Sequence, residues 1–284
     1  MGKSLDLEFY AFFDKKSSPL FNSGKNTVKV TDDIKLIYLK NYNVKKQYIP
    51  LPHLRSEMSM LTLSLVLTGV LVVWFGLPYL LKRWQIVCLR KQCRKSKVIV
   101  LTYDDGPSEV LTPILLNVLA SNDTHANFFM IGRKIESFPS LVNDVASKGH
   151  SIGSHSFNHF HAWKKNPLDV SSDIQAGFQI CKSISSSYLF RPPFGKITLA
   201  TLLQTWIAHQ KLAWWTIDST DTWINPLPIE NTIDRVRKEG GGVILMHDHD
   251  RSDANKHEYV IDLTLRLIQF AHDEGYNILT FQDL

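Results

Sequence analysis

The 284-residue chain contains little cysteine, which excludes a disulfide-stabilised fold and a zinc-finger fold. Its three cysteines are Cys88, Cys93 and Cys181. Cys88 and Cys93 lie five residues apart, with no further cysteine or histidine at zinc-finger spacing. We therefore expect free thiols and a fold stabilised by an ordinary hydrophobic core, which a chain of this length can bury.

The C-terminal two thirds of the chain lack an excess of positive charge, although the whole chain has a net charge of +5. Residues 1–97 contain 17 Lys and Arg against 6 Asp and Glu, whereas residues 98–284 contain 15 against 21. A catalytic groove for nucleic acid requires clustered cationic side chains. We therefore predict no nucleic-acid partner.

Residues 58–81 lack charged side chains altogether, which predicts a transmembrane helix. At about 1.5 Å per residue this helix is roughly 36 Å long, enough to cross a hydrocarbon core of about 30 Å. Trp74, Tyr79 and Trp84 lie toward its C-terminal end, as in an interfacial aromatic belt. A buried core helix is the alternative. We do not expect a cleaved signal peptide, because the stretch follows 57 residues and has no small-residue cleavage site.

Residues 82–97 contain seven Lys and Arg and no acid, so they are expected to form a basic juxtamembrane segment that suits anionic lipid. On the other flank, residues 38–57 contain four Lys and Arg. This difference favours the cytoplasmic side of a single-pass membrane protein for the C-terminal domain. Residues 1–57 contain no motif that assigns them a role, although the apolar run Ile34–Leu39 suggests a strand.

From Val98 to Leu284, short apolar runs alternate with amphipathic stretches and no repeat is visible. About seven β-then-α units predict a parallel α/β fold. We expect an irregular (β/α) barrel, closed or nearly closed, with a doubly wound open sheet as the alternative. The expected strands cover residues 98–103, 126–131, 151–153, 189–190, 212–217, 243–246 and 277–280, and the expected helices 108–120, 139–148, 168–183, 199–209, 229–238 and 259–272.

Polar residues follow the ends of five expected strands, which is where a parallel barrel carries its catalytic groups. These residues are Asp104 with Asp105, His155, Arg191, Asp218 with Asp221, and His247. The first pair ends an apolar run just before a Gly-Pro turn. Because adjacent strand residues point to opposite sides, we expect the two carboxylates to serve different partners. Solvated acids in a turn are the alternative for this segment alone.

His155 and His159 predict a metal site, because residues at i and i+4 share one face of a helical turn. Such a pair suits Zn²⁺ or a similar ion, although a lone pair at this spacing is often incidental. Zinc hydrolases commonly use three protein ligands and leave one position for water. Asp105 is the natural third ligand, which leaves Asp104 to act as the base.

Two further residues suit acid–base chemistry. Arg191 lies in a proline-rich loop, where its guanidinium can hold Asp104 ionised and correctly aimed. His247 is the expected general acid, since histidine is the usual proton donor near neutral pH. An adjacent carboxylate, from either Asp218 or Asp221, would raise its pKa.

Aromatic residues of the segment 214–223 can supply a flat face for a sugar ring. We expect Trp214 and Trp215 to lie mainly in the core and Trp223 to lie nearer the groove.

Five blocks in this order resemble the NodB-type polysaccharide deacetylases of carbohydrate esterase family 4. They are Thr102-Tyr-Asp-Asp-Gly-Pro107, His155-Ser-Phe-Asn-His159, Arg191-Pro-Pro-Phe-Gly195, Asp218-Ser-Thr-Asp221 and Leu245-Met-His247. The resemblance covers residues 98–284 and not residues 1–97. The blocks depart from the family pattern in two places: Tyr103 replaces the commoner Phe, and Thr222 separates the second aspartate of the fourth block from Trp223.

The resemblance implies an irregular (β/α) barrel and metal-dependent removal of an N- or O-acetyl group from a sugar. It implies a divalent metal ion, with zinc first and cobalt, manganese or nickel as alternatives. The roles that it implies are Asp104 as base, Asp105, His155 and His159 as metal ligands, Arg191 as the residue that positions the base, His247 as acid, and a backbone N–H near Phe194 as an oxyanion donor.

We predict a membrane-bound carbohydrate deacetylase whose partners are an N-acetylated glycan and the membrane. Peptidoglycan, a chito-oligosaccharide and a membrane-borne intermediate are the candidate substrates. One alternative is a deformylase or other deacylase of a lipid-linked aminosugar. The other is an inactive membrane protein that binds glycan, which is disfavoured because none of the expected catalytic residues is missing.

Overall fold

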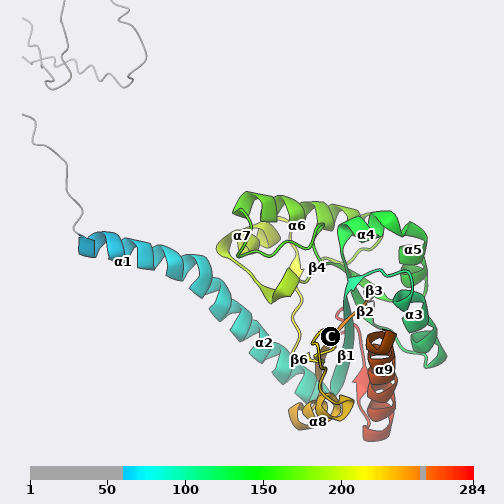
Figure 1. Ribbon diagram of the computed structural model, residues 1–284. Coiled ribbons are helices and arrows are strands. Elements are labelled where there is room, and N and C mark those ends of the chain that lie inside the picture. The colour runs from blue at the N-terminus through cyan, green and yellow to red at the C-terminus, as the bar shows by residue number, and fades with distance from the viewer. Residues whose placement is uncertain (1–59, 250–253) are drawn as a thin grey trace, which may run out of the picture. The chain divides into compact units, whose positions relative to one another are not determined.

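The computed structural model of the protein describes residues 60–249 and 254–284 (Figure 1). Met60–Leu284 form one compact unit. The strand expected at Ile34–Leu39 and the N-terminal region to which it belongs lie outside the described residues.

Eight parallel strands form one curled sheet with the layout of a half-barrel, which confirms the expected (β/α) fold. Its order is β5-β4-β3-β2-β1-β7-β6, and β8 pairs with the first two residues of β1. The strands are β1 Val98–Gly106, β2 Asn127–Met130, β3 Ser151–Ser154, β4 Leu189–Phe190, β5 Lys211–Leu212, β6 Ile217–Asp218, β7 Gly242–His247 and β8 Asn277–Ile278.

The helices that follow the strands cover the convex side of the sheet (Figure 1). They are α3 Leu111–Ser121, α4 Gly132–Ser137, α5 Pro139–Ser147, α6 Pro167–Lys182, α7 Leu199–Ile207, α8 Ile229–Glu239 and α9 Ala254–Glu274, with a 3₁₀ turn, η2, at Pro193–Gly195. Before the sheet, α1 Met60–Leu71, a π-helical turn η1 Val72–Gly76, and α2 Leu77–Ser96 form one continuous helix of 37 residues.

Both faces of β1 are buried, which makes this strand the centre of the domain. Ile99, Leu101 and Tyr103 belong to the main core with residues of α3 and α9. On the opposite face, Val98 and Val100 pack with Cys93 of α2. A parallel strand that is covered on both sides is expected to be apolar, and the first four residues of β1, Val98–Leu101, are all apolar.

The basic part of α2 packs on the sheet domain. Lys82 Nζ donates to Gly195 O over 2.7 Å, and Gln85 Oε1 accepts from the Trp214 indole N–H at the same distance. Arg90 donates to Thr216 O over 3.1 Å. Trp214 and Thr216 belong to the loop between β5 and β6, the two end strands of the sheet. Residues 82–96 therefore contact the sheet domain along much of their length.

The single strand expected over residues 212–217 is wrong. β5 ends at Leu212 and β6 begins at Ile217, and the two strands lie at opposite ends of the sheet. The segment between them turns Trp214 into the interior, where only 2% of its surface is exposed and its indole N–H meets Gln85. An apolar sequence is compatible with a buried connection as well as with a strand, so the pattern alone did not distinguish them.

The packing of β1 against the turn before β7 generates a stability prediction. Gly241 has φ of +121°, and a Cβ there would lie 2.4 Å from Val98 O. We expect Gly241→Ala to destabilise the protein by about 2–4 kcal/mol, through backbone strain and the overlap with β1. Thermal unfolding of the two proteins measures the difference.

Gly275→Ala is the matched control. Gly275 also has positive φ, +69°, but a Cβ there meets nothing within 4 Å. We expect the melting temperature of Gly275→Ala to fall by clearly less than the melting temperature of Gly241→Ala. Equal losses would show that the contact with Val98 contributes nothing.

Candidate active site

The residues singled out by sequence gather at the C-terminal ends of the strands. Asp104 and Asp105 lie near the end of β1, His155 directly follows β3, and Arg191 directly follows β4. Asp218 and His247 are the last residues of β6 and β7. Because β1 and β7 are parallel neighbours, Asp104 and His247 are register partners across them.

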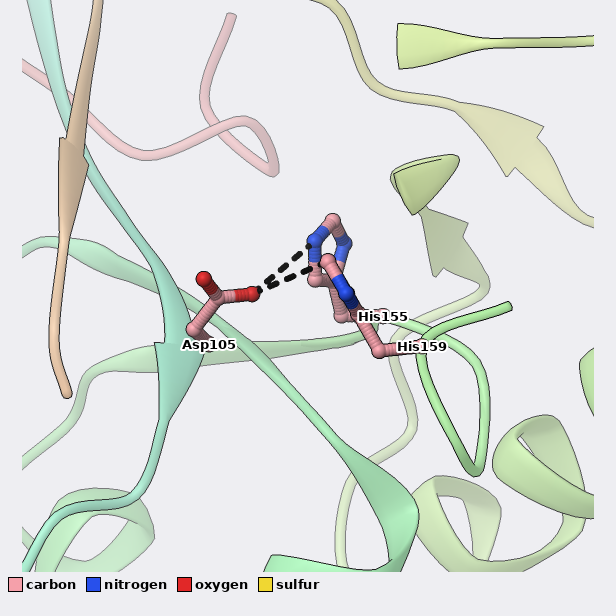
Figure 2. A group of neighbouring side chains, drawn as sticks. All are labelled: Asp105, His155 and His159. Atoms are coloured by element: carbon pink, nitrogen blue, oxygen red, sulfur yellow. Dashed lines mark ion pairs between the residues drawn. The ribbon is translucent and has the colours of Figure 1, made fainter. Parts of the chain in front are cut away.

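Asp105, His155 and His159 form a group that fits a divalent metal ion (Figure 2). Their ligand atoms lie within 4.8 Å of one another. Asp105 Oδ1 lies 3.4 Å from His155 Nε2 and 3.2 Å from His159 Nε2. This oxygen is buried and has no hydrogen-bond partner among the described residues. One carboxylate oxygen and two imidazole nitrogens are a donor set typical of a zinc hydrolase.

The protonation of the two histidines also suits a metal. His155 Nδ1 lies 2.7 Å from Arg191 O, and because a carbonyl oxygen only accepts, Nδ1 carries the proton. In the neutral tautomer that this contact favours, Nε2, the nitrogen nearer Asp105, carries the lone pair that a metal ligand needs. Burial, together with the neighbouring His155, lowers the pKa of His159 to about 4, so this ring is neutral at physiological pH. Neutral imidazoles are the form that binds metal.

The shared helical face expected for His155 and His159 is wrong. The segment 155–159 is not helical, and Ser156 and His159 have φ of +63° and +62°. The two rings meet because His155 continues directly from β3 and the chain then turns back, with Ser156 Oγ accepting from the His159 N–H over 3.0 Å. The residues converge through a loop that spacing alone cannot describe.

The two aspartates serve different partners as expected, Asp104 with Arg191 and Asp105 with the two histidines, but the expectation that they point to opposite sides is wrong. Asp104 Oδ2 lies 3.9 Å from His155 Nε2, the same nitrogen that Asp105 approaches. Asp105 has φ of +70°, and the pairing with β2 shifts register between Asp104 and Gly106. This irregularity interrupts the alternation of the strand, so both carboxylates face one site.

Burial alone would raise the pKa of the Asp105 carboxyl. The three neighbouring histidines, His155 first and then His247 and His159, instead hold this pKa well below its ordinary value. The carboxylate is therefore ionised across the physiological range.

Arg191 holds Asp104 in a buried ion pair. Arg191 Nη1 lies 2.7 Å from Asp104 Oδ1, and neither residue exposes more than 3% of its surface. The guanidinium also donates to Ala213 O over 3.2 Å and lies 4.0 Å above the Phe129 ring. Charge-assisted bonds of this kind fix the direction of a carboxylate.

Asp221, rather than Asp218, supports His247. Asp221 Oδ1 lies 3.0 Å from His247 Nδ1, and Oδ2 accepts from the His247 backbone N–H over 3.0 Å. Asp218 Oδ1 instead accepts from the Thr220 N–H. Burial lowers the pKa of His247, but the charge and hydrogen bond of Asp221 outweigh it and raise the pKa to about 9. His247 is therefore protonated at neutral pH and able to donate a proton.

Aromatic residues border the site. Phe194 has φ of +56°, exposes 54% of its surface, and its ring lies 4.6 Å from that of His159. Trp223 is 53% exposed, and Trp214 lies in the core as expected.

Two neighbours of the site were missed by sequence reasoning. His249 is not among the predicted site residues, but its Nδ1 lies 3.8 Å from Asp105 Oδ2. Its position two residues beyond His247 was the available signal. Asp248 was overlooked; it is fully buried and accepts from Ser108 Oγ and Thr112 Oγ1 over 2.7 and 2.6 Å.

Comparison with known proteins relates the chain to one family. Residues 91–208 match the family model for polysaccharide deacetylase. A peptidoglycan-N-acetylglucosamine deacetylase of Bacillus cereus is 32% identical over 194 residues, which cover 66% of this chain and 88% of that protein. A chitooligosaccharide deacetylase of Sinorhizobium fredii is 29% identical, covering 63% of this chain and 88% of that protein. The match to PgdA of Listeria monocytogenes covers only 40% of that longer protein.

Solved structures show the same fold. A family 4 carbohydrate esterase from Streptomyces lividans in complex with acetate is 28% identical, with a TM-score of 0.55 over 64% of this chain and 91% of that chain. The peptidoglycan deacetylase PdaC of Bacillus subtilis is also 28% identical, with a TM-score of 0.56 over 66% of this chain and 89% of that chain.

The pairing of His247 with Asp221 generates a prediction on proton affinity. The pKa of His247 lies above the 6.5 of a free histidine, so the pair stabilises the fold below pH 6.5 and this stabilisation is lost as the pH rises through about 9. In Asp221→Asn the largest attraction that opposes burial is gone, and we expect the pKa of His247 to fall clearly below 9. NMR titration of the ring in metal-free protein measures it.

Asp218→Asn serves as the control, since its carboxylate contacts the Thr220 backbone and should leave the pKa of His247 near 9. An unchanged pKa in Asp221→Asn would contradict the pairing.

Proposed function

The chain belongs to the polysaccharide deacetylase family and is a carbohydrate deacetylase, and on this premise we propose that it hydrolyses the acetamido group of an N-acetylated amino sugar with a bound divalent metal ion. One observation carries the proposal. Asp105, His155 and His159 form a candidate metal group. The buried carboxylate of Asp104 lies beside this group, and the protonated imidazole of His247 lies opposite Asp104 on the neighbouring strand β7. Amide hydrolysis needs these groups together: a water activator, a base and an acid.

Each side chain has a task in this proposal. Asp105, His155 and His159 would hold a divalent metal ion, which when bound would acidify a water and polarise the acyl carbonyl. Asp104, aimed by Arg191, takes a proton from the attacking water as its oxygen bonds to the acyl carbon. The C–N bond then breaks, and His247 gives its proton to the nitrogen that leaves. The products are acetate and a free amino sugar.

The remaining residues would shape the site around the sugar. A backbone N–H near Phe194 is proposed to stabilise the oxyanion of the acyl group, since donors aimed at this atom commonly make a large contribution. Trp223 is half-exposed and offers an aromatic face to the sugar. Asp221 keeps His247 protonated, and Asp218 shapes the turn that carries Asp221.

Zinc is the proposed metal because catalytic zinc sites commonly combine imidazole and carboxylate ligands with an open position for water. Cobalt, manganese and nickel accept the same donors.

We also propose that the helix Met60–Ser96 anchors the enzyme in a membrane. Its apolar part has a mean hydropathy of 2.2, and none of that window is buried within the protein. A glycan at the membrane surface is then the proposed substrate: nascent peptidoglycan, a chito-oligosaccharide or a lipid-linked precursor.

A second candidate function, removal of a formyl or other acyl group from a lipid-linked aminosugar, is favoured by one observation. The apolar helix runs directly into α2, which packs on the catalytic domain, so a lipid-linked substrate would share the membrane with the enzyme. A glycan-binding role without catalysis has no comparable support.

Substitutions separate metal binding from turnover. We expect Asp105→Ala and His155→Ala to lose both the metal and activity, because each removes a ligand. Asp104→Asn and His247→Ala should retain the metal but lose about 10²- to 10⁴-fold in kcat, the usual contribution of a general base or acid. Metal content by elemental analysis and acetate release from chito-oligosaccharides measure the two effects.

Acetate and formate are quantified together in that assay, so formate as the main product from a formylated aminosugar would favour the second candidate. Full turnover in Asp104→Asn would contradict the role of the base. Wild-type protein that binds metal and releases no acyl group would support the glycan-binding alternative.

The side of the membrane decides which glycans the enzyme meets. The excess of Lys and Arg in residues 82–97 favours the cytoplasmic side for the catalytic domain. A fluorescent reporter that folds only in the cytoplasm, fused after Leu284, is therefore expected to be active. An alkaline phosphatase fusion at the same point is the control, and its activity would place the domain outside and favour finished wall polymer as substrate.

A further inference from the structure

Helix α7 exposes its large apolar residues and buries its small polar ones, the reverse of a helix on a water-soluble domain. Leu203, Trp206 and Ile207 are 50%, 75% and 65% exposed. Thr201 and Thr205 are 1% and 3% exposed. The exposed residues, with Leu199 before them, follow the i, i+4, i+7, i+8 spacing of one helical stripe. No residue of Leu199–Ile207 is charged.

This apolar stripe lies beside the candidate membrane helix. α7 contacts η1 and also α2, and Figure 1 shows it next to the junction of α1 with α2. A second contact joins the same region, since the Phe75 ring of η1 meets the Trp163 ring edge-on at 5.7 Å. The stripe therefore continues the lipid-exposed surface of the helix.

The length of the helix sets the depth of this contact. α1 has 12 residues and, at about 1.5 Å each, is about 18 Å long, too short for a hydrocarbon core of about 30 Å. The apolar stretch cannot be extended toward the N-terminus, because Arg55 and Glu57 precede Met58. A span must therefore include η1 and the first turn of α2. Since α7 touches η1, its exposed stripe is brought to the boundary of the hydrocarbon.

We propose that Leu203, Trp206 and Ile207 of α7 insert into the lipid of the membrane that the helix Met60–Ser96 crosses. The inference rests on the membrane anchor proposed above. A helix lying in the interface buries its apolar face about 5–10 Å into the boundary between headgroups and acyl chains, a depth that a single stripe can reach. Tryptophan prefers this boundary, because its ring is apolar and its N–H remains near water.

Insertion of α7 would fix how the active site faces the membrane. A series of ring contacts leads from Phe75 through Trp163, His161 and Phe194 to His159, with centroid distances of 5.7, 6.3, 5.0 and 4.6 Å. The metal group is therefore held close to the lipid headgroups. This placement suits a glycan that is attached to the membrane or lies on it.

Lipid contact can be measured at single positions of the full-length chain. The background variant is Cys88→Ser, which removes the exposed thiol and keeps the buried Cys93 and Cys181. In this background one cysteine is introduced, by Trp206→Cys or Ile207→Cys, and is labelled with an environment-sensitive fluorophore. The protein is reconstituted into vesicles of phosphatidylethanolamine and phosphatidylglycerol, with and without lipids that carry a nitroxide on the acyl chain. We expect quenching at both positions that is comparable to the quenching of a label at Leu67 of α1.

Leu265→Cys is the matched negative control, because Leu265 is also apolar and 41% exposed but lies on α9, away from α7 (Figure 1). Its label should be quenched several-fold less. Quenching at Leu67 without quenching at Trp206 and Ile207 would overturn the α7 surface and leave the anchor intact. A label at Trp206 that is shielded from water but not quenched would assign the stripe to a protein partner and equally overturn the proposal.

Absence of quenching at Leu67 would overturn the anchor and the α7 surface together. Deacetylase activity on soluble chito-oligosaccharide reports on the enzyme separately, since none of the labelled residues lies in the catalytic group.

Discussion

Arg191 is the residue on which the geometry of the site depends. Its guanidinium aims Asp104, its Nε holds the Ala213 carbonyl, and its own carbonyl fixes the tautomer of His155. One residue therefore orients the proposed base and one of the proposed metal ligands. Because a buried charge left without its partner costs about 3–5 kcal/mol, the fold depends on this pair as much as the chemistry does.

Burial of Arg191 is possible because the sheet curls around it. The side chain follows β4 and crosses to β1, with its guanidinium stacked on Phe129 of β2. The strands between these ends, β2 and β3, have four residues each. The irregularity at Asp105 then brings a second carboxylate to the same place, which a regular strand would have turned away.

Sequence was sufficient for the parts of the fold that follow from periodicity, and insufficient where the backbone departs from it. The apolar runs predict most strands and helices, and the polar residues at their ends predict Asp104, His155, Arg191 and His247 as neighbours. The six-residue α4 was not foreseen, because it is too short to show a helical period. The left-handed residues Asp105, Ser156 and His159 decide which way the site faces, and none of them is a glycine that would have signalled a turn. The choice of Asp221 over Asp218 depends on the turn after β6, which brings Asp221 to His247, and both residues lie near the end of that one strand.

The basic part of α2 connects the candidate membrane helix to the loop beside the active site. Lys82 donates to Gly195 O and lies 4.8 Å from the Trp214 ring and 5.3 Å from the Trp215 ring. Gly195 follows Phe194, the residue beside the proposed oxyanion donor, and a Cβ on Gly195 would lie 2.5 Å from Trp215. The loop is therefore enclosed from behind by the helix that contains the candidate membrane span. In the proposed membrane arrangement, a helix that entered the lipid and also supported this loop would leave little freedom between the active site and the membrane, so the glycan would be presented at one height and in one orientation.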